Sequence, residues 1–248
     1  MPAPYLRGVR LVPERVEAWD VFPFDLPFVR GLDLAIEAPV TFFVGENGSG
    51  KSTLLEAVAA LLRLPVSGGG RNEVADARGP DDGAQLASAL RPSMARHPPD
   101  HYFFRGEHAA HFAELLEARE RDPDFLGDPY GRYGGRSLHE RSHGEAFLSV
   151  LTHRLEGGLY LMDEPESALS PQRQLALLAR MWTLVAEGRT QFIIATHSPL
   201  LMTFPGATLL DFDHGPLRPI ALEETSHYEI TRGVLTSPER YWKHLRSP

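Results

Sequence analysis

The stretch FFVGENGSGKST, residues 42–53, decides the fold of this chain. It continues the apolar run VTFFV (residues 40–44), which is rich in β-branched and aromatic residues and is typical of a buried strand. The residues after the glycine-rich turn, STLLEAVAALLR, have the spacing of a helix. A strand, a glycine-rich turn and a helix in this order bring backbone N–H groups to a phosphate. We therefore predict a phosphate-binding loop.

The turn fits the pattern G-x-x-x-x-G-K-[ST], which gives each polar residue a role. Lys51 is predicted to contact phosphate oxygens and to act in catalysis, and Ser52 is predicted to bind Mg²⁺. A chance glycine turn is the alternative, but it does not account for the strand before and the helix after. The predicted nucleotide-binding residues of the loop are Gly45, Glu46, Asn47, Gly48, Ser49, Gly50, Lys51, Ser52 and Thr53.

Two further apolar runs also end in polar residues. LYLM (residues 159–162) is followed by Asp163 and Glu164, and QFIIA (residues 191–195) is followed by Thr196 and His197. Parallel sheets bind ligands at the carboxyl ends of their strands. We therefore predict an α/β fold with a largely parallel central sheet flanked by helices, and a site at one edge of that sheet.

These polar residues suit chemistry on a phosphate, although each also has a simpler structural role open to it. Asp163 would orient Mg²⁺ through its waters, Glu164 would polarise the attacking water, and His197 would reach the γ-phosphate or that water. A solvated acidic turn and a structural histidine are the alternatives. The phosphate loop upstream favours the catalytic interpretation.

The remaining segments are predicted from periodicity and composition. Residues 171–188 are expected to form the crossover helix between two of the strands, with Ser170 as N-cap and Pro171 at the first helical position. Its apolar stripe is expected at Leu175, Leu178, Trp182 and Val185. Residues 67–99, rich in Gly, Pro and Arg, are expected to form a surface insertion with little regular structure. We expect a single domain over residues 1–248, with an inserted, partly helical region at 64–156.

The stretch RSHGEAFLSVL, residues 141–151, supports two compatible interpretations. Ser142 and Glu145 are spaced as a capping box, which would start a helix. Ser142 and Gly144 at an exposed helix N-terminus would also form an anion site.

Composition limits the classes of function. The 248 residues include no cysteine, which excludes disulfides and Cys-based metal sites. The first residues contain no apolar stretch of signal-peptide length and no window approaches the length of a membrane span, so we expect a cytoplasmic protein without membrane insertion. The net charge of −8 means that nucleic acid would need a local basic patch, and the candidate residues are Arg71, Arg78, Arg91 and Arg96.

The order of these motifs resembles the ABC-type ATPase head. The run HERSHGEAFLSVLTHRLEGGLYLMDEPESALSPQRQ is similar to small stand-alone ATPases that are called AAA family ATPases, and the resemblance covers nearly the whole chain. It implies ATP and Mg²⁺ as ligands and ATP hydrolysis as the activity. It also implies that Asp163 is the Walker B acid, Glu164 the catalytic base and His197 the switch histidine.

The resemblance further implies an assembly. Ser142, Gly144 and Glu145 fall on the signature motif, which contacts ATP held by the other subunit, so a head-to-tail homodimer with ATP at its interface is implied. ATP binding would close this dimer and hydrolysis would open it. His143 stands where the family has a glycine, which bears on the dimer geometry, and Ser170 stands where it has an aspartate, which bears on the coupling between the two sites.

Two parts of the family pattern have only candidates here. In HYFFRGEH, residues 101–108, Arg105 or Glu107 stands near the place of the Q-loop glutamine. Phe22 and Phe24 are candidates for stacking on adenine, with core packing as the alternative.

The favoured function is an ATP-hydrolysing switch that changes how a partner, nucleic acid or protein, is gripped. An ATP-binding subunit of a membrane transporter is one alternative, which the missing Q-loop glutamine disfavours. A non-hydrolysing nucleotide sensor is another, which Glu164 disfavours. A GTPase is disfavoured because the sequence has no Asn-Lys-x-Asp motif.

Overall fold

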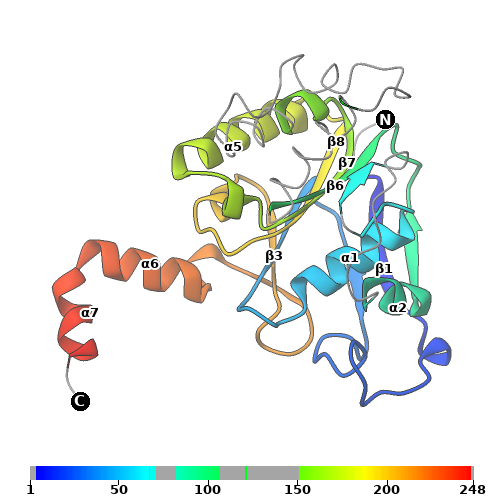
Figure 1. Ribbon diagram of the computed structural model, residues 1–248, viewed down its shortest axis with the longest axis horizontal. Coiled ribbons are helices and arrows are strands. Elements are labelled where there is room, and N and C mark those ends of the chain that lie inside the picture. The colour runs from blue at the N-terminus through cyan, green and yellow to red at the C-terminus, as the bar shows by residue number, and fades with distance from the viewer. Residues whose placement is uncertain (1–3, 67, 71–81, 107–120, 122–150, 247–248) are drawn as a thin grey trace.

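A computed structural model describes residues 4–66, 68–70, 82–106, 121 and 151–246 (Figure 1). Its main sheet has seven strands in the order β10-β9-β3-β8-β7-β6-β4. Five neighbouring strands are parallel: β9 (Thr208–Asp211), β3 (Val40–Val44), β8 (Thr190–Ala195), β7 (Gly158–Asp163) and β6 (His101–Arg105). The edge strands β10 (Arg218–Ile220) and β4 (Gly69–Gly70) are antiparallel to their neighbours. The predicted α/β fold with a largely parallel sheet is confirmed.

The central strands are buried on both faces, as their continuous apolar sequences predict. Helix α1 (Lys51–Leu61) covers one face and α5 (Pro171–Ala186) covers the other (Figure 1). Alternate residues of β3 divide between the two layers, because Phe43 packs in the cluster of α1 and Phe42 packs in the cluster of α5. Every strand that carries predicted chemistry is therefore held between two layers of helices.

The predicted stripe of α5 is wrong by one position. Leu175 and Trp182 are exposed, and Leu178 and Val185 are half-buried. The buried residues of the helix are Gln174, Leu177, Met181 and Leu184. Both stripes have helical spacing, so periodicity does not choose between them. The buried stripe includes the polar Gln174, whose side chain donates to Leu169 O at 3.0 Å and accepts from Ser198 Oγ at 2.6 Å.

A second, antiparallel sheet has the order β2-β1-β5 and shares a hydrophobic cluster with α1. It consists of β2 (Asp33–Ala35), β1 (Leu6–Leu11) and β5 (Leu90–Met94), and α2 (Asp82–Ala89) precedes β5. The expectation of little regular structure over residues 67–99 is thus wrong for 82–94. Leu86, Ala89 and Leu90 are buried in the same cluster as α1, and three apolar residues among many polar ones gave too weak a pattern to predict this.

The chain ends in two helices, α6 (Ser226–Thr236) and α7 (Pro238–Leu245), which project from the body (Figure 1). Short 3₁₀ helices within the described residues connect other elements: η1 (Pro13–Arg15), η5 (Pro165–Ala168), η6 (Leu201–Thr203) and η7 (Leu222–Glu224). In the described parts of the chain, no helix combines the length and apolar character that crossing a bilayer requires.

One buried side chain joins the two sheets. Gln191 on β8 accepts the backbone N–H groups of Tyr5 and Leu6 at 2.8 and 2.9 Å, and it donates to Leu6 O at 2.8 Å. It is fully buried. Because buried backbone groups need partners, this amide fixes the start of β1 against the main sheet.

Gln191→Leu should lower the free energy of unfolding by at least about 2 kcal/mol, because it leaves three buried backbone groups without partners. The neighbouring Thr190→Val is the matched control: Thr190 is as buried, and its hydroxyl makes no hydrogen bond to any residue that the structure describes. We expect Thr190→Val to stay within about 0.5 kcal/mol of wild type. Urea unfolding measures both variants, and equal stabilities would contradict the role of Gln191.

Candidate nucleotide site

The predicted loop lies between β3 and α1, at the carboxyl edge of the parallel sheet. Two glycines have conformations that other residues rarely adopt. Gly48 has φ of 80° and is exposed, and a Cβ there would meet no atom of the described residues within 4 Å. Gly50 has φ of 93°, and a Cβ there would lie 2.6 Å from Phe28 Cε1. Gly48 therefore leaves room for a ligand beside the loop, and Gly50 lets the loop pack against Phe28.

The Lys51 ammonium is held inside the loop. Its side chain is buried, and Nζ donates to Gly45 O at 2.7 Å and to Glu46 O at 2.8 Å. Burial lowers the pKa of Lys51, and nearby carboxylates oppose this by favouring the charged form. These carboxylates belong to Glu164, Asp213, Asp163 and Glu46.

Ser52 and Asp163 meet directly. The Ser52 hydroxyl, in the first turn of α1, donates to Asp163 Oδ1 at 2.9 Å. Asp163 ends β7 and is buried. The two predicted metal ligands therefore lie side by side, although 111 residues separate them in sequence.

Arg105 ends β6 and stands beside Asp163 in the register of the two strands. Its guanidinium lies 3.4 Å from Asp163 Oδ2 and donates to Glu56 Oε1 at 2.7 Å. Of the two Q-loop candidates, Arg105 thus reaches the site, and Glu107 lies outside the described residues. A basic side chain here balances part of the carboxylate charge.

Glu164 lies on the other side of the strand end, in a strained conformation. Its φ of 45° places it in the left-handed region, which non-glycine residues rarely occupy. Its backbone N donates to Ala195 O at 2.9 Å, and its carbonyl accepts from Ser167 Oγ at 2.8 Å. A Cβ on Gly106 would lie 2.1 Å from the same carbonyl, so only glycine fits beside it. Strain of this kind is found at functional positions, where the surrounding structure maintains it.

His197 faces Glu164. Its Nε2 lies 3.3 Å from Glu164 Oε1 and makes no well-formed hydrogen bond within the described part of the chain. Burial and the Lys51 charge lower the pKa of His197, while Glu164 raises it. His197 is therefore neutral near pH 7, with one ring nitrogen available as a donor.

A second acid, Glu166, positions this histidine. Glu166 Oε1 accepts from Thr196 Oγ1 at 2.8 Å and from the backbone N of His197 at 2.5 Å. Burial raises the pKa of Glu166, and the two hydrogen bonds oppose that rise. Sequence reasoning missed Glu166, because it looked like part of an acidic turn.

The start of α6 also reaches the site, which the sequence did not indicate. His227 Nε2 lies 3.0 Å from His197 Nδ1, and Ser226 Oγ donates to Glu46 Oε1 at 3.1 Å. Asp213, after β9, accepts from the Glu46 backbone N at 2.7 Å. These residues are far from the motifs in sequence and match no recognised pattern. The Thr225 cap of α6 is a local signal, but it indicates a helix start and not a functional site.

The charges of the site fit a magnesium–nucleotide better than a free anion. A phosphate would meet the Lys51 ammonium and the open backbone at Gly48, but four carboxylates surround the ammonium. A divalent cation between Ser52 and Asp163 would offset them. Among the described residues, no group of three or more His, Cys, Asp or Glu side chains could hold a metal. Mg²⁺ held together with phosphates needs fewer protein ligands than this.

Three predicted residues cannot be placed, because Ser142, Gly144 and Glu145 lie outside the described residues. The two candidates for stacking on adenine differ in their environment. Phe24 is buried in the core, whereas Phe22 is exposed. Phe24 therefore packs in the core, which was the alternative to stacking on adenine.

Two segments of the chain match models of known protein families. Residues 22–81 match a family model described as "AAA domain", and residues 145–203 match one described as "AAA domain, putative AbiEii toxin, Type IV TA system". No curated protein matches the chain. The first matched segment contains the phosphate loop with Lys51, and the second contains the strand ends with Asp163, Glu164 and His197.

Solved structures share the fold. The ATP-binding cassette of an ABC transporter is similar at a TM-score of 0.51 and 16% identity, over 96% of this chain and 97% of that one. An Smc head bound to the C-winged helix domain of ScpA has a TM-score of 0.49 and 11% identity, over 89% of this chain and 99% of that one. Of these two, the cassette alone exceeds 0.5, so the fold comparison depends on it. Two segments of the chain thus match AAA-domain family models, and the chain has the fold of that ATP-binding cassette.

Proposed function

We propose that the protein binds Mg-ATP in the loop of residues 45–53 and hydrolyses it. The observation that carries this proposal is the contact of Ser52 Oγ with Asp163 Oδ1, beside the buried Lys51 ammonium. Lys51 would hold phosphate oxygens, and Ser52 and Asp163 would hold the cation. ATP supplies a terminal phosphoryl group that water can accept.

Glu164 and His197 would act on the attacking water. Glu164 would be the general base, because its carboxylate is half exposed and can approach a water. Neutral His197 would present Nε2–H toward the carboxylate and the region in front of it. In that tautomer Nδ1 accepts, so His227 must donate through Nε2. His227 is then a positioning residue that fixes the tautomer of His197.

We further propose that hydrolysis occurs in a head-to-tail homodimer, and that closing and opening of this dimer changes how it binds a partner. The support is the Ser142-x-Gly144-Glu145 sequence in the expected order between the loop and Asp163. This sequence would contact ATP held by the other subunit and would end the inserted region that we propose at residues 64–156.

Glu164→Gln should abolish most ATP hydrolysis and trap the dimer. Removing a general base slows a reaction by about 10²–10⁴-fold, while the loop and the metal ligands remain. Solution mass by light scattering should show a monomer without nucleotide and a dimer with Mg-ATP. The double variant Lys51→Ala/Glu164→Gln is the control and should stay monomeric. A Glu164→Gln variant that binds ATP and stays monomeric would contradict the proposed assembly.

The lowered pKa of His197 predicts how stability depends on pH. The unfolded chain takes up the proton more readily, so this contribution is present above about pH 6.5 and is lost as the pH falls. The free energy of unfolding of wild type should fall between pH 7.5 and 5.5, and that of His197→Asn should fall less. The difference between the two slopes should be under about 1.4 kcal/mol per pH unit, which is the most that one titrating group can contribute. His97→Asn, at an exposed position, is the control and should keep the wild-type slope. Urea unfolding at both pH values measures this, and equal slopes for His197→Asn and wild type would refute it.

His227→Leu should lower kcat for ATP hydrolysis about tenfold with little change in KM, because one orienting hydrogen bond is lost. His227→Gln keeps a donor and should recover part of kcat. Steady-state kinetics with both variants test the tautomer assignment. Equal losses for Leu and Gln, or a change confined to KM, would show that His227 only supports the fold.

A further inference from the structure

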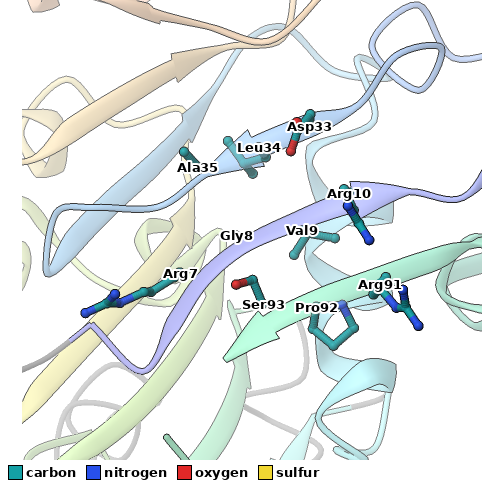
Figure 2. A pocket seen from close by; sticks show the side chains of 10 residues that line it. All are labelled: Arg7, Gly8, Val9, Arg10, Asp33, Leu34, Ala35, Arg91, Pro92 and Ser93. Atoms are coloured by element: carbon teal, nitrogen blue, oxygen red, sulfur yellow. The ribbon is translucent and has the colours of Figure 1, made fainter. Parts of the chain in front are cut away.

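The second sheet carries a groove that is separate from the nucleotide site. It has a volume of about 390 Å³ and is lined by residues of β2, β1 and β5 (Figure 2). The strand register explains its shape, because it aligns residues of the three strands in cross-strand rows. Arg10, Asp33 and Arg91 form one exposed row, and in the next row exposed Ala35 and Ser93 stand on either side of buried Gly8.

The floor of the groove is a row of small residues. Gly8 on β1 pairs with Ala35 on β2 and with Ser93 on β5. A Cβ on Gly8 would lie 2.5 Å from Leu34 O, so the centre of this row must remain without a side chain. Three adjacent strands thus leave a trough across the middle of the sheet.

One side of the trough is a row of charged residues. Arg10 on β1 pairs with Asp33 on one side and with Arg91 on the other (Figure 2). Like charges directly opposite each other on neighbouring strands destabilise a sheet. Repulsion between Arg10 and Arg91 therefore lowers the stability of this sheet, and an anionic ligand bound to both would remove that repulsion.

Arg7 supplies a third positive charge, on the far side of the floor from Arg10. The pairing of β1 with β5 shifts between Leu6 and Gly8, so β1 has one extra residue at this point. Strict alternation from exposed Arg10 would turn Arg7 toward the core, but Arg7 is exposed. A bulge re-aims a side chain in this way, and here it adds a cation to the groove.

These arginines are available for a ligand. Within the described residues, Arg7, Arg10 and Arg91 make no side-chain hydrogen bond or ion pair, and Asp33 is the one acid lining the groove. This contrasts with the chain as a whole, whose net charge is −8. Of the other arginines suggested by the sequence, Arg96 instead lies 4.4 Å over the Tyr5 ring. Arg71 and Arg78 lie outside the described residues.

We propose that this groove binds phosphate groups along a nucleic-acid strand. Arginine forks bond phosphate oxygens in pairs, and three of them on both sides of a trough suit successive phosphates better than one isolated anion. The rigid sheet holds them at fixed spacing. The site requires neither the loop at Lys51 nor ATP hydrolysis.

The test is fluorescence anisotropy of a fluorescein-labelled oligothymidylate with the full chain, without ATP. Arg10→Ala/Arg91→Ala should weaken binding at least about tenfold and should reduce the slope of log K against log salt by about 1.4. Arg63→Ala/Arg240→Ala removes the same charge from exposed positions outside the groove and should bind like wild type. Lys51→Ala should also bind like wild type, which separates this groove from the nucleotide site.

Thermal unfolding provides a check on folding, because removal of the like-charged pair should leave Tm unchanged or raised. Competition identifies the source of the phosphate: unlabelled oligothymidylate should displace the probe far better than pyrophosphate. The proposal is overturned if wild type does not bind at about 50 mM salt, or if both double variants bind equally. It is also overturned if pyrophosphate or polyglutamate competes as well as the oligonucleotide.

Discussion

A buried ammonium, that of Lys51, is the constraint on which the nucleotide site depends. It holds the loop by two hydrogen bonds to the carbonyls of Gly45 and Glu46, while the surrounding carboxylates favour its charge. Burying a cation is costly unless such partners are present. The loop, the start of α1 and the strand ends must therefore stay together. A magnesium ion bound with the proposed nucleotide would offset the charge of the same acids.

Around this cation the site divides into two connected groups. Ser52, Asp163 and Arg105 form the part that would hold the metal and phosphates. Glu164, His197 and His227 form the part that would handle the water, and His227 ties it to α6. The first group lies on strands and the first turn of a helix, which gives it a rigid frame. The second includes the strained backbone of Glu164, which the contacts of its carbonyl and N–H maintain.

The parallel core followed from the sequence because apolar runs of strand length that each end in polar residues are typical of parallel sheets with ligands at their carboxyl edge. The buried face of α5 did not follow, since two stripes had the same period and the buried one includes a polar residue, Gln174, whose hydrogen-bond partners are known only from the structure. The structured segment at residues 82–94 was hidden by its polar composition, and its apolar residues are buried only because α1 and β1 lie beside them. The contacts of His227 and Asp213 with the site could not be predicted for a different reason. They join residues that are far apart in sequence and come together only in the folded chain.

The most direct measurement is calorimetric titration of Mg-ATP into wild type, Lys51→Ala and Lys243→Ala. These are the two lysines of the chain, so the last variant removes the same charge away from the loop. Wild type and Lys243→Ala should bind alike, and Lys51→Ala should lose about 10–100-fold in affinity, as expected for charged hydrogen bonds. Equal affinities for both lysine variants, or no binding by wild type, would contradict the account of the site.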